Sequence, residues 1–155
     1  MVDLSVKIGD VTLKNPIMPA SGAFSWDYGD VIDLNRLGGL VAKTICREPR
    51  LGNPTPRMAE TEAGIIQSIG LPGKGIEYFL ENIVPEYNKW EPPLIVSVSS
   101  ETAEDFASMT RDLTVDGVDV IEVNISCPTR DPNGGNFSLH ADHTKMVMEG
   151  IRAAT

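Results

Sequence analysis

The chain has 155 residues, of which 41% are hydrophobic, and its formal net charge is −9 at pH 7. This length and apolar content suffice for one hydrophobic core of ordinary size. The acidic balance argues against nucleic acid and anionic membrane surfaces as partners. No apolar run approaches the ~18–20 residues that span a bilayer. The N-terminal residues also lack the pattern of a secretory signal, which predicts a cytoplasmic protein with Cys46 and Cys127 as free thiols.

Strand and helix patterns alternate along the chain. Residues 5–15 predict a small hairpin around Gly9 and Asp10. Apolar or alternating stretches then predict strands at 16–22, 38–45, 92–100 and 118–126. Periodic segments predict helices at 28–37, 75–89, 101–117 and 140–155. A long polar excursion, which begins with REPRLGNPTPRMAETEAG, separates the second strand from the second helix.

Strands separated by helices imply parallel pairing, because a parallel neighbour needs a crossover connection. A closed (β/α)8 barrel and an open doubly wound sheet both meet that requirement. One side of each strand turns polar near its C-terminal end, as Ser97 and Asn124 do. An open sheet covered on both faces would be apolar throughout, whereas the lumen of a barrel carries an active site at its top. The pattern therefore favours the barrel.

The predicted fold class is α/β, the N-terminal half of a (β/α)8 TIM barrel with a small N-terminal β-hairpin. A complete barrel takes about 250 residues, and this chain has four βα units. We therefore expect residues 1–155 to form a single barrel domain that is truncated after the fourth unit. A protein of only four units would have to dimerise to close its sheet.

Polar side chains stand at the predicted strand tops, where a barrel brings them to one mouth. They are Ser21, Lys43, Ser97, Asn124 and Ser126, with Cys127 at the base of the following loop. Lysine supplies a cation for an electron-rich ring, and an asparagine amide both donates and accepts hydrogen bonds. A thiolate can remove a proton from carbon if its pKa is lowered. This combination suits redox chemistry on a flat polar heterocycle, and the glycine-rich DPNGGN indicates a mobile lid over it.

Four segments, NPIMPASGAF, AKTICREPRLGNPTPR, GIIQSIGLPGKG and VIEVNISCP, occur in this order and spacing. Together they resemble the catalytic subunit of class 1 dihydroorotate dehydrogenase, and the resemblance runs from about residue 3 to residue 155. It implies a (β/α)8 barrel that binds FMN and oxidises dihydroorotate to orotate in pyrimidine biosynthesis.

The resemblance also implies roles for individual residues. Cys127 would be the catalytic base, taking a proton from C5 of the dihydropyrimidine while a hydride leaves C6 for N5 of the flavin. The residues implied to bind the cofactor are Ala20, Ser21, Gly22, Lys43, Thr44, Ser97 and Asn124. The residues implied to bind the substrate are Lys43, Gln67, Ser68, Ile69, Gly70, Leu71, Asn124 and Ser126. No metal is predicted.

A cysteine base is the class 1 pattern, and the N-terminal segments look closer to the NAD-linked 1B type. That type resembles a heterotetramer with an FAD and iron–sulfur electron-transfer subunit, so the full-length protein is expected to be a homodimer or a heterotetramer.

The chain departs from the family at four positions where asparagine is usual, namely Gln67, Gly73, Ser97 and Thr129. Serine and threonine cannot reproduce a two-way amide contact, and a site built for a polar substrate loses heavily when such partners are missing. One alternative is therefore an FMN barrel for another dihydropyrimidine, similar to the uracil-reducing barrel of dihydropyrimidine dehydrogenase. A second alternative is an inactive half-barrel that works as an assembly or binding module.

Overall fold

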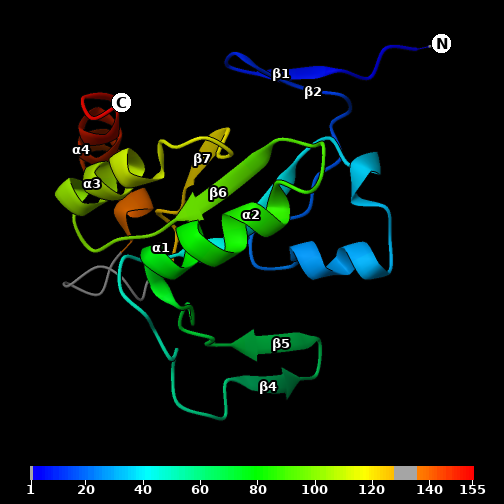
Figure 1. Cartoon of the computed structure of the whole chain (residues 1–155). Helices are drawn as coiled ribbons and strands as arrows, with labels where there is room; N and C mark the ends of the chain where they lie inside the picture. Colours follow the sequence, from blue (N-terminus) through cyan, green and yellow to red (C-terminus); the bar gives the residue numbers. More distant parts are fainter. Residues whose placement is uncertain (1, 128–135) are drawn as a thin grey trace.

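A three-stranded parallel sheet forms the centre of the computed structural model, which describes residues 2–127 and 136–155 (Figure 1). Its strands are β3 (Leu40–Ile45), β6 (Leu94–Val98) and β7 (Val120–Val123), with β6 in the middle. Every residue of β6 is buried, which explains the nearly unbroken apolar run that is typical of a central parallel strand. The strands predicted at 38–45, 92–100 and 118–126 and their parallel pairing are confirmed. These three strands form an open sheet, and closure into a barrel stays a prediction.

The helix predicted at 75–89 is confirmed as a continuous helical segment from residue 75 to residue 87, but its middle is widened. It consists of α1 (Gly75–Tyr78), a π-helical stretch η3 (Phe79–Ile83) and α2 (Val84–Tyr87). Pro85, in the first turn of α2, has no N–H to close an α-helical hydrogen bond to the turn before it. The wider turn lies where that bond is missing.

The helices predicted at 101–117 and 140–155 are confirmed as α3 (Ala103–Leu113) and α4 (Ala141–Arg152), both shorter than expected. The side chain of Thr102 caps α3 by accepting a hydrogen bond from the N–H of Asp105 at 3.1 Å. A short 3-10 turn, η4 (Phe137–Leu139), precedes α4. Gly150 of α4 lies against Ala103 and Ala107 of α3, which lets the two helices pack side by side (Figure 1).

The hydrophobic core lies between one face of the sheet and the helices. Its fully buried members include Leu40, Val96, Phe106, Met109, Leu113 and Val147. These residues come from β3, β6, α3 and α4, so the core joins the sheet to the two C-terminal helices. None of the helices described is both long enough and apolar enough to cross a bilayer.

The predicted N-terminal hairpin is confirmed as β1 (Val6–Ile8) and β2 (Val11–Leu13), joined through Gly9 at φ 58°. Its strands are largely exposed, but Leu13 is fully buried. The side chains of Leu13 and Ile95 both lie beside Gly39. The hairpin is therefore anchored at the N-terminal end of the sheet, on the face away from α3 and α4.

The strand predicted at 16–22 is wrong, because the structure has no strand there. Pro16 and Pro19 have no N–H to donate to a strand ladder. The N–H of Ile17 bonds to the side chain of Asn15 at 3.0 Å, and its carbonyl accepts from Gly38 at 2.7 Å. One backbone bond to the start of β3 is too little to make a strand.

The helix predicted at 28–37 is also wrong. Two short 3-10 turns take its place, η1 (Trp26–Asp30) and η2 (Leu34–Arg36). The β-branched Val31 and Ile32 between them disfavour a continuous helix. Asp33 then starts the second turn by accepting the N–H of Asn35 with its carboxylate at 3.0 Å.

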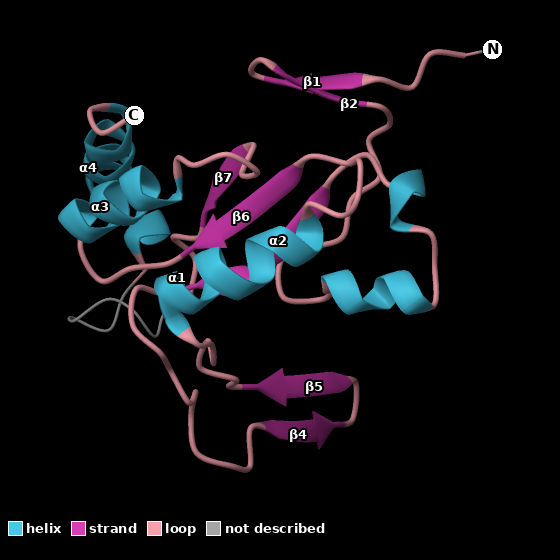
Figure 2. Ribbon diagram, in the orientation of Figure 1, coloured by secondary structure: helices cyan, strands magenta, loops and turns pink. Residues whose placement is uncertain are grey.

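The polar excursion contains a second hairpin that the sequence analysis did not predict. Its strands, β4 (Met58–Thr61) and β5 (Gly64–Gln67), are antiparallel and exposed along their whole length. Figure 2 shows this hairpin projecting away from the sheet and helices. Gln67 thus ends a strand, and the residues after it lead back toward β3.

Candidate functional site

An extra residue in β3 turns two consecutive side chains toward the same face of the sheet. Ala42 pairs with Val96 and Ile45 pairs with Val98, so Lys43 and Thr44 together lie opposite one residue of β6, Ser97. Bulges of this kind re-aim side chains and are common beside active sites. Strict alternation would place Thr44 on the helix-covered face. Instead its hydroxyl lies 2.8 Å from that of Ser97.

Asn124, just past the end of β7, connects the strand ends. Its backbone N–H donates to the carbonyl of Val98 at 2.9 Å and extends the ladder to β6. Its amide N–H groups donate to Thr44 Oγ1 at 3.2 Å and to Cys127 Sγ at 3.1 Å. Its amide oxygen accepts from the backbone N–H and hydroxyl of Ser126 at 3.3 and 3.2 Å. One carboxamide thereby fixes the thiol relative to two strands.

A cavity of about 370 Å³ opens above this hydrogen-bond network. Its lining combines small residues, one lysine, one carboxylate, one amide and the thiol. The lining residues are Ser21, Gly22, Lys43, Thr44, Leu71, Glu122, Val123, Asn124, Ser126 and Cys127. Its size lies within the range of small-molecule sites. The structure thus brings together eight residues that the sequence analysis assigned to the site.

The remaining predicted site residues do not line this cavity. They are Ala20, Gln67, Ser68, Ile69, Gly70 and Ser97. Ser97 is fully buried, and its hydroxyl is paired with Thr44 beneath the cavity. The amide oxygen of Gln67 accepts the N–H of Ile69 at 3.2 Å, and Ser68 Oγ accepts from the side chain of Asn53 at 2.6 Å. Thr129 and the glycine-rich stretch up to residue 135 lie outside the described residues.

Glu122 is a cavity residue that the sequence analysis did not assign to the site. It pairs with Ser97 in the sheet register. The alternation of β7 carried this signal, since Glu122 shares the polar side of the strand with Asn124. Its carboxylate puts a negative charge in the same cavity as the Lys43 ammonium.

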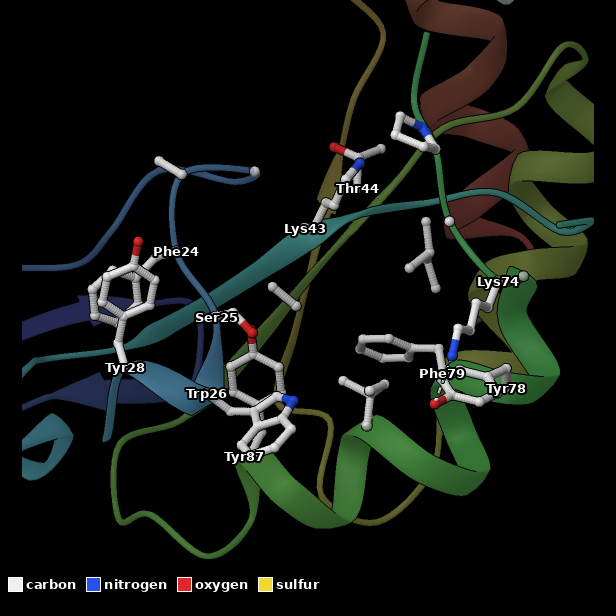
Figure 3. Close-up of a pocket in the computed structure, with 18 residues that line it drawn as sticks. Phe24, Ser25, Trp26, Tyr28, Lys43, Thr44, Lys74, Tyr78, Phe79 and Tyr87 are labelled. Atoms are coloured by element: carbon white, nitrogen blue, oxygen red, sulfur yellow. Dashed lines mark hydrogen bonds between the residues drawn. The ribbon is translucent and has the colours of Figure 1, made fainter. Parts of the chain in front are cut away.

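A second cavity, of about 480 Å³, adjoins Lys43 and Thr44 (Figure 3). Aromatic side chains dominate its lining, and Figure 3 shows Tyr87 and Phe79 of the helical segment facing it. Burial raises the pKa of Tyr87 to about 12.

Burial lowers the pKa of Lys43, and the nearby thiols of Cys46 and Cys127 partly oppose the shift. Between the lowered folded-state pKa and the ordinary 10.5, the unfolded chain binds more protons than the folded one. The free energy of unfolding contributed by Lys43 therefore rises with pH in that window. The partial burial of the charged ammonium costs the wild type stability at lower pH, and Lys43→Met removes that cost. The variant should therefore be more stable than the wild type at lower pH, and this difference should shrink as pH rises.

Urea unfolding of both proteins at several pH values below 10.5 measures that difference. A stability difference that stays constant across this window would contradict a partly buried ammonium at residue 43.

Thr44→Val should destabilise the protein by about 1–3 kcal/mol, because it leaves the fully buried hydroxyl of Ser97 without its partner. Thr44→Ser keeps the hydroxyl and is the matched control, expected to lose less. Urea unfolding of both variants checks the prediction. Equal losses would show that the methyl group of Thr44 matters and the hydrogen bonds do not.

Comparison with known proteins adds independent findings. The family model for dihydroorotate dehydrogenase matches residues 3–154. A protein of Thermoanaerobacter sp. (strain X514) is 38% identical over 156 residues, which cover 99% of this chain and 52% of that protein. A protein of Desulforamulus reducens is 43% identical over 153 residues, which cover 94% of this chain and 50% of that protein. Both are named dihydroorotate dehydrogenase B (NAD(+)), catalytic subunit.

Among solved structures, dihydroorotate dehydrogenase from Eimeria tenella in complex with ferulenol has the same fold, with a TM-score of 0.70 at 20% identity. The match covers 98% of this chain and 44% of that one. This chain therefore spans about half the length of the relatives it matches.

Proposed function

Because the chain belongs to the dihydroorotate dehydrogenase family, we propose that it forms the N-terminal half of a (β/α)8 barrel that oxidises dihydroorotate to orotate in pyrimidine biosynthesis. The observation that carries the proposal is the convergence of Lys43, Asn124 and Cys127 on one cavity at the carboxyl end of the parallel sheet, from β3 and from the residues after β7. Barrel enzymes place their chemistry at that end.

The residues around the cavity fit FMN as the cofactor. Gly22, at φ 82°, leaves open space where a Cβ would stand, so a flat ring can approach the backbone. Lys43 and Asn124 offer a cation and a two-way amide to the polar edge of such a ring. FMN, when bound, supplies the acceptor for the hydride. We propose Ala20, Ser21, Gly22, Lys43, Thr44, Ser97 and Asn124 as the cofactor-binding residues.

Cys127 is proposed as the base that removes the proton from C5 of dihydroorotate. The proton moves from carbon to Sγ, which must be a thiolate to accept it. The Asn124 side chain donates a hydrogen bond to Sγ at 3.1 Å, and the Lys43 ammonium lines the same cavity. The same ammonium attracts the anionic substrate. The proposed substrate-binding residues are Lys43, Gln67, Ser68, Ile69, Gly70, Leu71, Asn124 and Ser126.

The relatives are named as catalytic subunits, which implies a partner subunit in those proteins. We propose the same for this one, as the NAD-linked 1B type in the cytoplasm, with an FAD and iron–sulfur electron-transfer subunit. The assembled enzyme is then a heterotetramer built on a homodimer.

The experiment joins residues 1–155 to the half of the Thermoanaerobacter protein that they do not match, and loads the chimera with FMN. Dihydroorotate added without oxygen should bleach the visible absorption of the flavin. Dihydrouracil is the comparison substrate, because Gln67 and Ser97 stand where the family usually has asparagine. Bleaching by dihydrouracil alone would favour the other dihydropyrimidine, and a loaded flavin that neither compound bleaches would contradict the function.

A non-catalytic half-barrel is the other candidate. The described sheet is open, with β3 and β7 as its edge strands, and barrel enzymes often hold phosphate after their seventh and eighth strands. Mixing the 155-residue chain alone with FMN tests it. We expect weak binding or none, and a tightly bound stoichiometric flavin would show that the second half is not required.

A further inference from the structure

Leu71 reaches the cavity from the far end of the excursion, residues 48–74, and it does so in a strained conformation. Its φ is 52°, a left-handed value that a non-glycine residue adopts only when its surroundings impose it. Leu71 is also the excursion residue that lines the cavity beside Cys127. The position of the excursion thus sets where Leu71 lies against the cavity.

Backbone hydrogen bonds join the two ends of the excursion, residues 47–50 and 73–76, which we call its neck. Arg50 and Gly73 exchange two of them, at 2.8 and 2.9 Å, and the carbonyl of Arg47 accepts the N–H of Ile76 at 3.0 Å. Gly75, at φ 86°, lets the two chain segments of the neck approach each other, because a Cβ at this position would lie 2.9 Å from the Arg47 carbonyl oxygen. Both ends of the excursion therefore meet at Arg47.

The side chain of Arg47 fastens this neck to α3. Its guanidinium donates to Asp105 at 2.6 Å, to Ser108 at 2.7 Å and to Asp112 at 2.9 Å. These partners are spaced three and four residues apart, so they form one stripe along the helix. The hydrogen bond to Asp105 is the largest reason that the pKa of Arg47 is raised. Guanidinium–carboxylate bonds are among the strongest that side chains make.

We propose that Arg47 is a positioning residue: by binding the neck of the excursion to α3, it holds Leu71 over the cavity that contains Cys127. Arg47 does not line that cavity, so it acts through the excursion. The consequence for substrate rests on the proposed function. The position of the excursion can be measured without substrate or turnover.

The test follows amide hydrogen exchange and thiol alkylation in the 155-residue chain. In Arg47→Ala, exchange of the amides in residues 51–71 should rise about tenfold or more, because charge-assisted bonds that hold the neck are lost. Exchange in β6 should rise less. Alkylation of Cys127 by iodoacetamide should accelerate several-fold relative to the buried Cys46, and Arg47→Lys should fall between Arg47→Ala and the wild type.

Two control variants separate positioning from general stability. Arg111→Ala removes an exposed arginine of α3 outside the stripe and should leave both measurements unchanged. Leu113→Ala opens the core and should raise exchange in the excursion and β6 together. If Arg47→Ala behaves like either control, the proposal is overturned. Faster exchange in the excursion with unchanged alkylation of Cys127 would overturn it too, because the excursion would then not cover the thiol.

Discussion

Cys127→Ala is expected to lower the rate of dihydroorotate-dependent flavin bleaching by a factor of about 10²–10⁴, the usual contribution of a positioned base. Binding of FMN should survive, because the thiol stands at the edge of the hydrogen-bond network. Without it, the Asn124 amide still bonds Thr44 and Ser126. Stopped-flow absorbance of the chimera measures the rate, and flavin fluorescence measures binding.

Cys46→Ala is the matched control, since Cys46 is buried at the end of β3 and does not line the cavity. Its bleaching rate should stay close to that of the wild type. A Cys127→Ala rate within threefold of this control would show that another group accepts the proton.

Phe106→Ala is expected to lower the free energy of unfolding by about 3–5 kcal/mol, the range for truncating a buried phenylalanine. Phe106 has no exposed surface and packs edge-to-face on Phe137, with ring centroids 5.9 Å apart. The loss is a large part of the stability of an ordinary domain. Chemical denaturation monitored by circular dichroism measures it.

Phe24→Ala provides the comparison, because Phe24 is only partly buried and stacks on the exposed Tyr28. Its loss should be clearly smaller. Equal losses in the two variants would mean that the core between α3 and the sheet does not dominate stability.

The central sheet could be predicted from the sequence because its signal is local. Leu94 to Val98 form an apolar run of strand length, and a capped amphipathic helix follows. The segment 16–22 has a similar composition, but Pro16 and Pro19 remove ladder donors. An apolar composition indicates that a segment is buried. To form a strand, the segment also needs backbone N–H groups that can bond to a neighbouring strand.

The candidate site was predicted in part for a similar reason. Lys43, Asn124 and Cys127 follow from the rule that parallel strands end at one edge, and the structure places them around one cavity. The bulge that turns Thr44 toward Ser97 depends on pairing between strands, which alternation within one strand cannot report. Gln67 is held by a local bond to Ile69, a detail of the excursion that no periodicity encodes.

Protection of Cys127 from iodoacetamide by orotate tests the central claim most directly, because it needs neither FMN nor turnover. Lys43, Asn124 and Cys127 surround one cavity, so saturating orotate should slow alkylation of Cys127 in the wild type. Lys43→Met and Asn124→Ala should each remove that protection, while Arg111→Ala should keep it. Alkylation of Cys127 at the same rate with and without saturating orotate would contradict a shared site for the ammonium, the amide and the thiol.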